Sequence, residues 1–110
     1  MDERLTKRRE ILRSLLTEAQ NDLNLPPDQP EWIAERLASV AEFVDHHEFE
    51  VALDVLADIG GGFECSSRFW RRLKQAADVM GLDDWRHYLR GEYRTALKRE
   101  GTAQTPPARQ

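Results

Sequence analysis

A chain of 110 residues with 40% hydrophobic and 33% charged side chains can form one folded domain around a single core and has no room for a second. No run approaches the roughly 18 consecutive apolar residues of a membrane span, and no signal-peptide block follows the charged N-terminus, so we expect a cytoplasmic protein that does not enter membranes. The single cysteine, Cys65, excludes an internal disulfide and a zinc site built from several cysteines.

The net charge of -4 is unevenly distributed along the chain. Residues 1–24 carry five acidic and five basic residues, whereas residues 25–66 carry ten acidic residues and one basic residue. Residues 67–110 carry ten basic and five acidic residues. A local negative potential speeds encounter with a basic surface and disfavours nucleic acid at the same face. Internal pairing between the acidic middle and the basic C-terminal third is the alternative explanation.

Apolar residues recur at helical spacing through most of the chain, and strand alternation is absent from the sequence. We therefore predict an all-α, single compact bundle of about five helices over residues 1–100, followed by a disordered tail over residues 101–110. The first helix covers residues 2–24 and is stopped by Pro26 and Pro27. Its apolar face consists of Ile11, Leu12, Leu15, Leu16, Ala19 and Leu23.

A second helix is predicted to begin near Pro30, because proline suits the first turn, with Asp28 available as its N-cap. The face opposite its core stripe is acidic, so this helix shows solvent a continuous row of carboxylates. The core stripe is Ile33, Leu37, Val40, Ala41 and Val44, and the acidic face is Glu31, Glu35, Glu42 and Asp45.

A break near His47 separates a third helix, residues 48–59, whose apolar residues cover roughly 200° of its circumference. We expect this helix to be the most buried. Its narrow exposed strip carries Glu50, Asp54 and Asp58 at i, i+4 spacings, where like charges cost a few tenths of a kcal/mol per pair. We infer that something other than helix stability favours this strip. The apolar residues are Phe49, Val51, Ala52, Leu53, Val55, Leu56 and Ile59.

The run of three glycines at residues 60–62 is expected to end the third helix and to open a flexible connection through Cys65. Ser66 or Ser67 can cap a fourth helix. The apolar side of that helix is predicted to contain Phe69, Trp70, Leu73, Ala76, Ala77 and Met80, and its polar side Arg68, Arg71, Arg72 and Gln75.

A fifth helix follows Gly81, which is a natural C-terminal stop for the fourth, and Asp83 or Asp84 can cap it. The inward positions of the fifth helix are predicted to be Leu82, Trp85, Leu89, Tyr93 and Leu97.

We find no convincing sequence pattern for catalysis, for a metal or for another cofactor, and we therefore expect a binding protein rather than an enzyme. His46 and His47 lie beside acidic residues but lack the HExxH or paired Glu-x-x-His spacing of metal sites. The three glycines follow a predicted helix and lack the GxxxxGK pattern. Trp32, Trp70 and Trp85 lie in or beside apolar stripes, which favours core packing over base stacking.

One long stretch of the chain resembles a known family. The segment EWIAERLASVAEFVDHHEFEVALDVLADIG, followed by FWRRLKQAADVMGLDDWRHYL, is similar to the small helical immunity proteins of bacterial polymorphic toxin systems, above all the MafI-like group. The similarity consists of a helix, the turn DHHEFEVALD, a second helix ending near an acidic loop, and a helix closing on MGLDD. It implies a protein that binds and neutralises the C-terminal domain of a cognate toxin, and many such toxins are nucleases.

A nuclease cleft must be basic to hold a phosphate backbone, so an acidic protein can occupy it. Carboxylates can then replace phosphates in contacts with the arginine and lysine side chains of the toxin. Aromatic or aliphatic anchors supply the lasting affinity, and Phe63 is one candidate. The predicted partner-binding residues are Glu35, Glu42, Asp45, Glu48, Glu50, Asp54, Asp58, Phe63 and Glu64.

The sequence also allows two other functions. An enzyme would have to use Cys65, His46 or His47 as its reactive group. A small regulatory or adaptor module would contact nucleic acid or a transcription component through the basic fourth helix, although a pI of about 5.4 and the neighbouring acidic residues oppose such contact. The basic residues available for it are Arg68, Arg71, Arg72 and Lys74.

Overall fold

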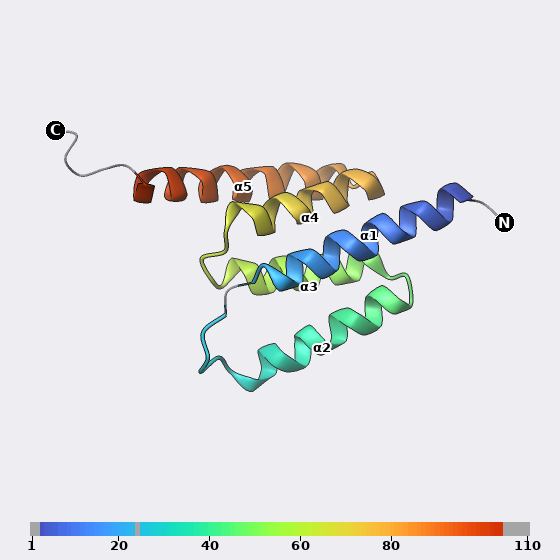
Figure 1. Cartoon of the computed structure of the whole chain (residues 1–110), viewed down its shortest axis with the longest axis horizontal. Coiled ribbons are helices and arrows are strands. Elements are labelled where there is room, and N and C mark those ends of the chain that lie inside the picture. The colour runs from blue at the N-terminus through green and yellow to red at the C-terminus, as the bar shows by residue number, and fades with distance from the viewer. Residues whose placement is uncertain (1–2, 24, 105–110) are drawn as a thin grey trace.

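Five helices make up most of the computed structural model, which describes residues 3–23 and 25–104 (Figure 1). No strand occurs in these residues, so the predicted all-α class and the number of helices are confirmed. Within the same ranges, no helix is both long enough and apolar enough to cross a membrane. The helices are α1 (Glu3–Asn21), α2 (Glu31–Asp45), α3 (Phe49–Gly61), α4 (Ser67–Met80) and α5 (Asp83–Gln104).

Several predicted helix ends were wrong, and the first helix ends at Asn21 rather than near residue 24. The N-cap of α2 is Pro30, in an extended conformation and without a side-chain cap bond, because Asp28 lies two residues too early to reach the first turn. At the other end of the chain, α5 continues through Gln104 rather than stopping at residue 100, since one glycine at position 101 costs only about 1 kcal/mol in a helix. The rest of the predicted tail, residues 105–110, lies outside the described residues.

A tight turn joins α2 to α3 at the predicted break near His47. His47 has a φ of 60°, a left-handed conformation that turns the following N–H, that of Glu48, back toward the end of α2, and the N–H of His47 itself donates to the carbonyl of Val44 at 3.1 Å. The N–H of Glu48 donates to the carbonyl of Phe43 at 2.7 Å. These bonds satisfy groups at the end of α2 and reverse the chain within three residues, so α2 and α3 form a helical hairpin.

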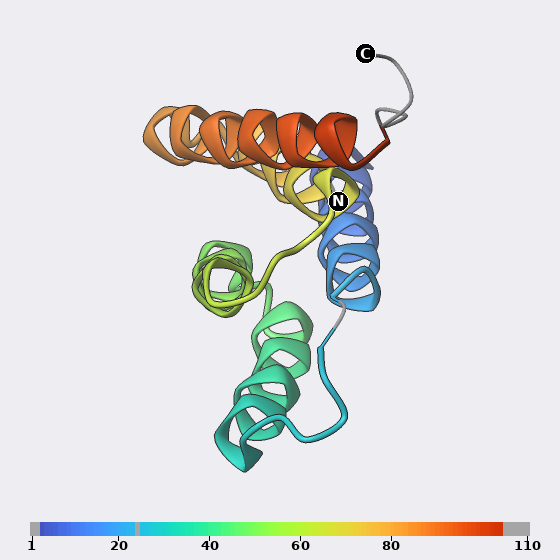
Figure 2. The same ribbon diagram turned by 90° about the vertical axis from the view of Figure 1, so that its left-hand side faces the viewer.

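The helices are arranged as two hairpins with α1 between them (Figure 2). α4 packs against α5, α1 and α3, whereas α2 packs against α3 and α1. In both views α2 and α5 lie at opposite ends of this stack, and α3 lies between them (Figures 1 and 2). The acidic α2–α3 hairpin therefore lies on one side of the stack and the basic α4–α5 hairpin on the other, with α3 next to α4.

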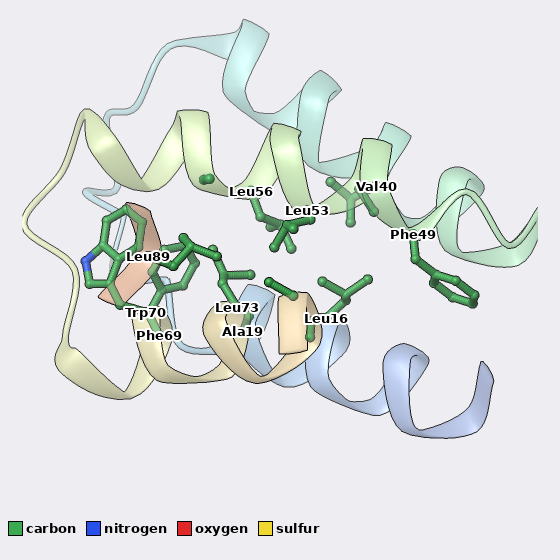
Figure 3. Close-up of a cluster of buried hydrophobic side chains, with 14 of the residues drawn as sticks. Leu16, Ala19, Val40, Phe49, Leu53, Leu56, Phe69, Trp70, Leu73 and Leu89 are labelled. Carbon is green, nitrogen blue, oxygen red and sulfur yellow. The ribbon is translucent and has the colours of Figure 1, made fainter. Parts of the chain in front are cut away.

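The core draws on all five helices (Figure 3). α3 contributes seven buried residues, more than any other helix, as predicted. Four residues assigned to apolar stripes are instead exposed, because helices at the surface of a small bundle bury only the centre of each stripe. They are Ile11, Ala41, Val51 and Leu97, and Trp32, expected in or beside a stripe, is exposed as well.

The first of the three glycines has a packing role that the sequence did not reveal. α3 continues through Gly60 and Gly61, so the predicted end at Ile59 was too early. A Cβ on Gly60 would lie 2.7 Å from Cζ of Phe69 and 3.3 Å from Cη2 of Trp70. The two rings meet edge to face with centroids 4.9 Å apart. Only glycine therefore lets α4 approach α3 this closely.

Replacing Gly60 by alanine should lower the free energy of unfolding by about 1–3 kcal/mol, because Phe69 must leave its rotamer or the helices must separate. Gly61 is the matched control, since nothing lies within 4 Å of the position of its Cβ. Gly61→Ala should raise stability by up to about 1 kcal/mol through its helix propensity. Urea unfolding measures both, and equal effects of the two substitutions would contradict the packing role of Gly60.

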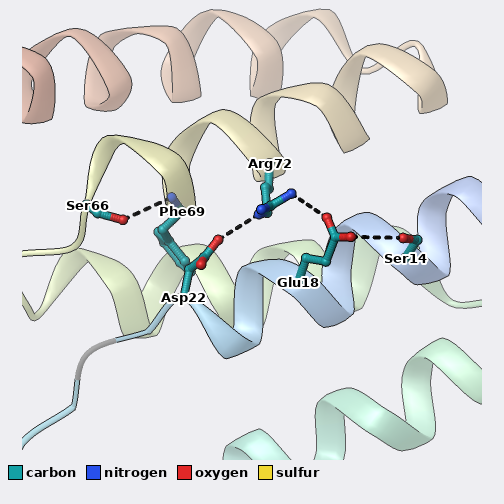
Figure 4. Close-up of polar contacts among 6 residues, drawn as sticks. All are labelled: Ser14, Glu18, Asp22, Ser66, Phe69 and Arg72. Atoms are coloured by element: carbon teal, nitrogen blue, oxygen red, sulfur yellow. Dashed lines mark hydrogen bonds and ion pairs between the residues drawn. The ribbon is translucent and has the colours of Figure 1, made fainter.

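Arg72 joins α4 to α1 through two ion pairs (Figure 4). Its Nε donates to Asp22 at 2.6 Å, and its Nη1 donates to Glu18, one helical turn away on α1. The Arg72 side chain is 26% exposed and that of Asp22 is 17% exposed. The hydrogen bond to Asp22 is the main cause that raises the pKa of Arg72. Arg72 therefore has a structural role and is not available to a nucleic-acid ligand.

Arg72→Met should lower the free energy of unfolding by about 1–2 kcal/mol, because two neighbouring carboxylates lose their shared partner. Arg71→Met is the control: Arg71 is exposed and has no ion pair with a described residue. Its effect should stay within about 0.5 kcal/mol. Thermal unfolding of both variants tests this. An Arg72 variant as stable as the parent would show that the ion pairs of Arg72 with Glu18 and Asp22 contribute nothing to stability.

Candidate functional site

The acidic residues 25–66 are not neutralised by the basic C-terminal third. Where the structure describes them, the acids of this section form two ion pairs, Asp45 with Arg13 and Asp58 with Arg36. The ion pairs of the bases in α4 and α5 go instead to acids in α1, α4 and α5. Internal pairing between the two sections, the alternative raised by the sequence, therefore does not account for the acidic middle.

The acidic strip of α3, which consists of Glu50, Asp54 and Asp58, is exposed along its whole length, as predicted. The Asp58 carboxylate lies 3.1 Å from the guanidinium of Arg36 of α2, and the two side chains are 61% and 42% exposed. Glu50 and Asp54 form no ion pair with any residue in the described ranges. Their negative charges, one helical turn apart, face solvent without a local counter-charge at hydrogen-bond distance.

The acidic face of α2 is also exposed but points elsewhere. Glu35 and Glu42 lie opposite the side of α2 that packs on α3, and neither pairs with a described residue. Asp45 is exposed too, but its carboxylate accepts a hydrogen bond from Arg13 of α1 at 2.8 Å. Asp45 is therefore turned toward α1 and away from the strip on α3.

The remaining predicted residues lie at the two ends of α3. Glu48 and Glu50 line a hollow of about 410 Å³ that also contains Arg8 and Arg9 of α1, so the potential at this end is mixed. At the opposite end, Phe63 and Glu64 line a separate hollow of about 270 Å³. Phe63 is partly buried against the core. The nine predicted residues thus belong to different surfaces, and within the acidic strip Glu50 and Asp54 have no ion pair with a described residue.

Two aromatic residues beside the strip were not predicted as site residues. Trp85 and Tyr88 of α5 meet edge to face with centroids 5.9 Å apart, and Tyr88 is 47% exposed. Burial raises the pKa of the Tyr88 phenol, and the charges of Glu92 and Asp58 raise it further. Glu50 of α3 and Trp85 line the same hollow of about 400 Å³, so the aromatic pair lies near the N-terminal end of α3. Helical periodicity could not reveal this proximity, because it gives the faces of α5 but not its neighbours.

Cys65 is not a reactive thiol. Its side chain is buried, with Sγ 3.7 Å from the carbonyl oxygen of Gly60. Burial raises the pKa of Cys65 to about 11, although the charge of Arg99 opposes this shift. The thiolate is the nucleophilic form, so the native thiol has little capacity to react near neutral pH.

Native protein should therefore resist a thiol reagent such as 5,5′-dithiobis(2-nitrobenzoate) at mildly alkaline pH, where about one thiol in a thousand is ionised. Unfolding in guanidinium should restore labelling at the rate of a free cysteine, which serves as the internal control. Rapid labelling of the folded chain would show that Cys65 is accessible and would contradict its burial.

No cluster of three or more His, Cys, Asp or Glu side chains suited to a metal ion occurs in residues 3–23 and 25–101. Comparison of the chain with protein-family models, curated proteins and solved structures finds no significant match.

Proposed function

We propose that this chain is an immunity protein that binds a basic toxin domain, in particular a nuclease, in the cytoplasm and occludes its cleft without catalysis. The observation that carries the proposal is the acidic strip of α3, where Glu50 and Asp54 are exposed and have no ion pair with a described residue. The resemblance of residues 31–89 to MafI-like immunity proteins supports the same function.

Charge on this strip favours a binding role over a structural one. Like charges at i, i+4 spacing destabilise a helix by a few tenths of a kcal/mol per pair, and a basic partner would remove that cost. The pair between Asp58 and Arg36 is partly solvent-exposed, and ion pairs of this kind contribute little, so Asp58 can exchange Arg36 for a base of the partner. The strip can therefore present three carboxylates to a basic cleft.

The distribution of charge over the whole molecule orients the encounter. The acidic α2–α3 hairpin lies on one side of the stack and the basic α4–α5 hairpin on the other (Figure 2). A basic cleft is attracted to the first and repelled by the second, and such steering can raise association rates by about 10–1000-fold at low salt. Fast capture suits an inhibitor that must act before the toxin cuts.

The double substitution Glu50→Lys and Asp54→Lys tests the proposal. We expect association with the toxin domain encoded immediately upstream of the gene to slow at least about tenfold at low salt, because the steering charge is reversed. Stopped-flow kinetics measures the rate, and circular dichroism checks that the helices persist.

Glu3→Lys with Glu10→Lys is the matched control, since it changes the net charge equally on the outward face of α1. This variant should associate at close to the parental rate. Equal slowing by both double variants would mean that only net charge matters, and no slowing by the first would eliminate the acidic strip as the binding surface.

A regulatory module that contacts nucleic acid or a transcription component is the second candidate, and one observation favours it. Arg90, Arg94 and Lys98 form an exposed row at i, i+4 spacing on α5, with no ion pair to a described residue. On α4, Arg72 and Lys74 are paired, whereas Arg68 and Arg71 are exposed and have no ion pair with a described residue, so the basic surface includes both α4 and α5. Salt-sensitive binding of nucleic acid, with no binding of the toxin domain, would favour this function.

A further inference from the structure

Trp85 and Tyr88 line a small hollow on the surface of α5. Asp84 completes its wall, and the hollow has a volume of about 290 Å³ with a largely apolar lining. The two rings stand at 79° to each other, so one presents its face where the other presents its edge. A hollow of this size accepts a single side chain of a partner rather than a larger ligand.

Carboxylates from two helices surround this aromatic pair. Asp84 and Trp85 also line an adjoining hollow of about 400 Å³, to which α3 contributes Glu50. The charges of Glu92 of α5 and Asp58 of α3 add to the effect of burial in raising the pKa of the Tyr88 phenol. The partial positive charge at the start of α5 is offset by the two acids of its first turn, Asp83 and Asp84.

An aromatic face flanked by carboxylates attracts cations and rejects anions. Between the two cationic side chains, arginine fits better: its guanidinium is planar and weakly hydrated, stacks on aromatic rings, and directs several N–H groups in its plane. Stacked on one ring of the pair, a guanidinium can direct those N–H groups toward a flanking carboxylate. A lysine ammonium is more strongly hydrated and loses more on entering an apolar hollow.

We propose that Trp85 and Tyr88 form a pocket for an arginine side chain of the partner protein. The proposal rests on the proposed function, because it names the chemistry of the anchor that such a partner would insert. The acidic strip on α3 then acts on the rate of encounter, whereas the aromatic pair acts on the lifetime of the complex and on the choice of arginine over lysine.

Isothermal titration with nona-arginine and nona-lysine at low ionic strength tests the pocket. Parent protein should bind nona-arginine about 5–10-fold more tightly than nona-lysine. Trp85→Leu with Tyr88→Leu keeps apolar bulk but removes both π systems, so it should bind the two peptides equally. Tyr88→Leu alone removes the more exposed ring with less effect on folding and should reduce the preference in part. Circular dichroism confirms that each variant is folded.

Trp32→Leu is the matched control, because Trp32 is 51% exposed and has no aromatic partner among the described residues. It should leave the arginine preference unchanged. The proposal is overturned if the parent shows no preference, if the preference survives the double substitution, or if Trp32→Leu removes it as effectively.

The peptide titrations, taken with the kinetics of toxin binding, separate the arginine pocket from the proposed function. A preference for nona-arginine without binding of the toxin domain would contradict the immunity function and support the arginine pocket. Binding of the toxin domain without a preference for arginine would contradict the pocket alone.

Discussion

The close approach of α3 and α4 at Gly60 is the constraint on which the candidate surface depends. Because Gly60 has no side chain, Phe69 of α4 packs directly on α3. The start of α4 is in turn fixed to α5, since Glu100 accepts hydrogen bonds from the N–H and the hydroxyl of Ser67 at 2.8 and 2.7 Å, which hold the pKa of Glu100 below its usual value. These contacts fix the position of α5 relative to α3. They therefore also place the aromatic pair, Trp85 and Tyr88, beside the acidic strip.

Ion pairing leaves the two sides of the molecule with opposite charge. Arg72 is held by acids of α1, and the bases that begin α5 are held by neighbours on α4 and α5. No described ion pair crosses from these bases to the acidic α2–α3 hairpin. Stability is thus supplied by the apolar core and by pairs within α1, α4 and α5, so the charge of the α3 strip can be altered with little effect on the fold. This separation makes the strip suitable for a binding role.

The sequence predicted the helices well because periodicity is a local property: the faces of α3, the break at His47 and the capping serine of α4, Ser66, all follow from near neighbours. It could not predict which helices touch. The packing of Gly60 against α4, the exposure of Trp32 and the nearness of Trp85 to α3 depend on residues far apart in the chain. The acidic strip was therefore foreseen, whereas its aromatic neighbours were not.

Carboxyl footprinting of the chain, free and bound to a toxin domain of the kind proposed, tests the central claim most directly. A carbodiimide with glycine ethyl ester labels exposed carboxylates, and mass spectrometry gives the extent at each residue. Burial of the α3 strip in the complex would reduce labelling of Glu50 and Asp54 and leave that of Glu10 on α1 unchanged. Equal labelling of Glu50 and Asp54 in the free and bound states would show that the partner binds elsewhere.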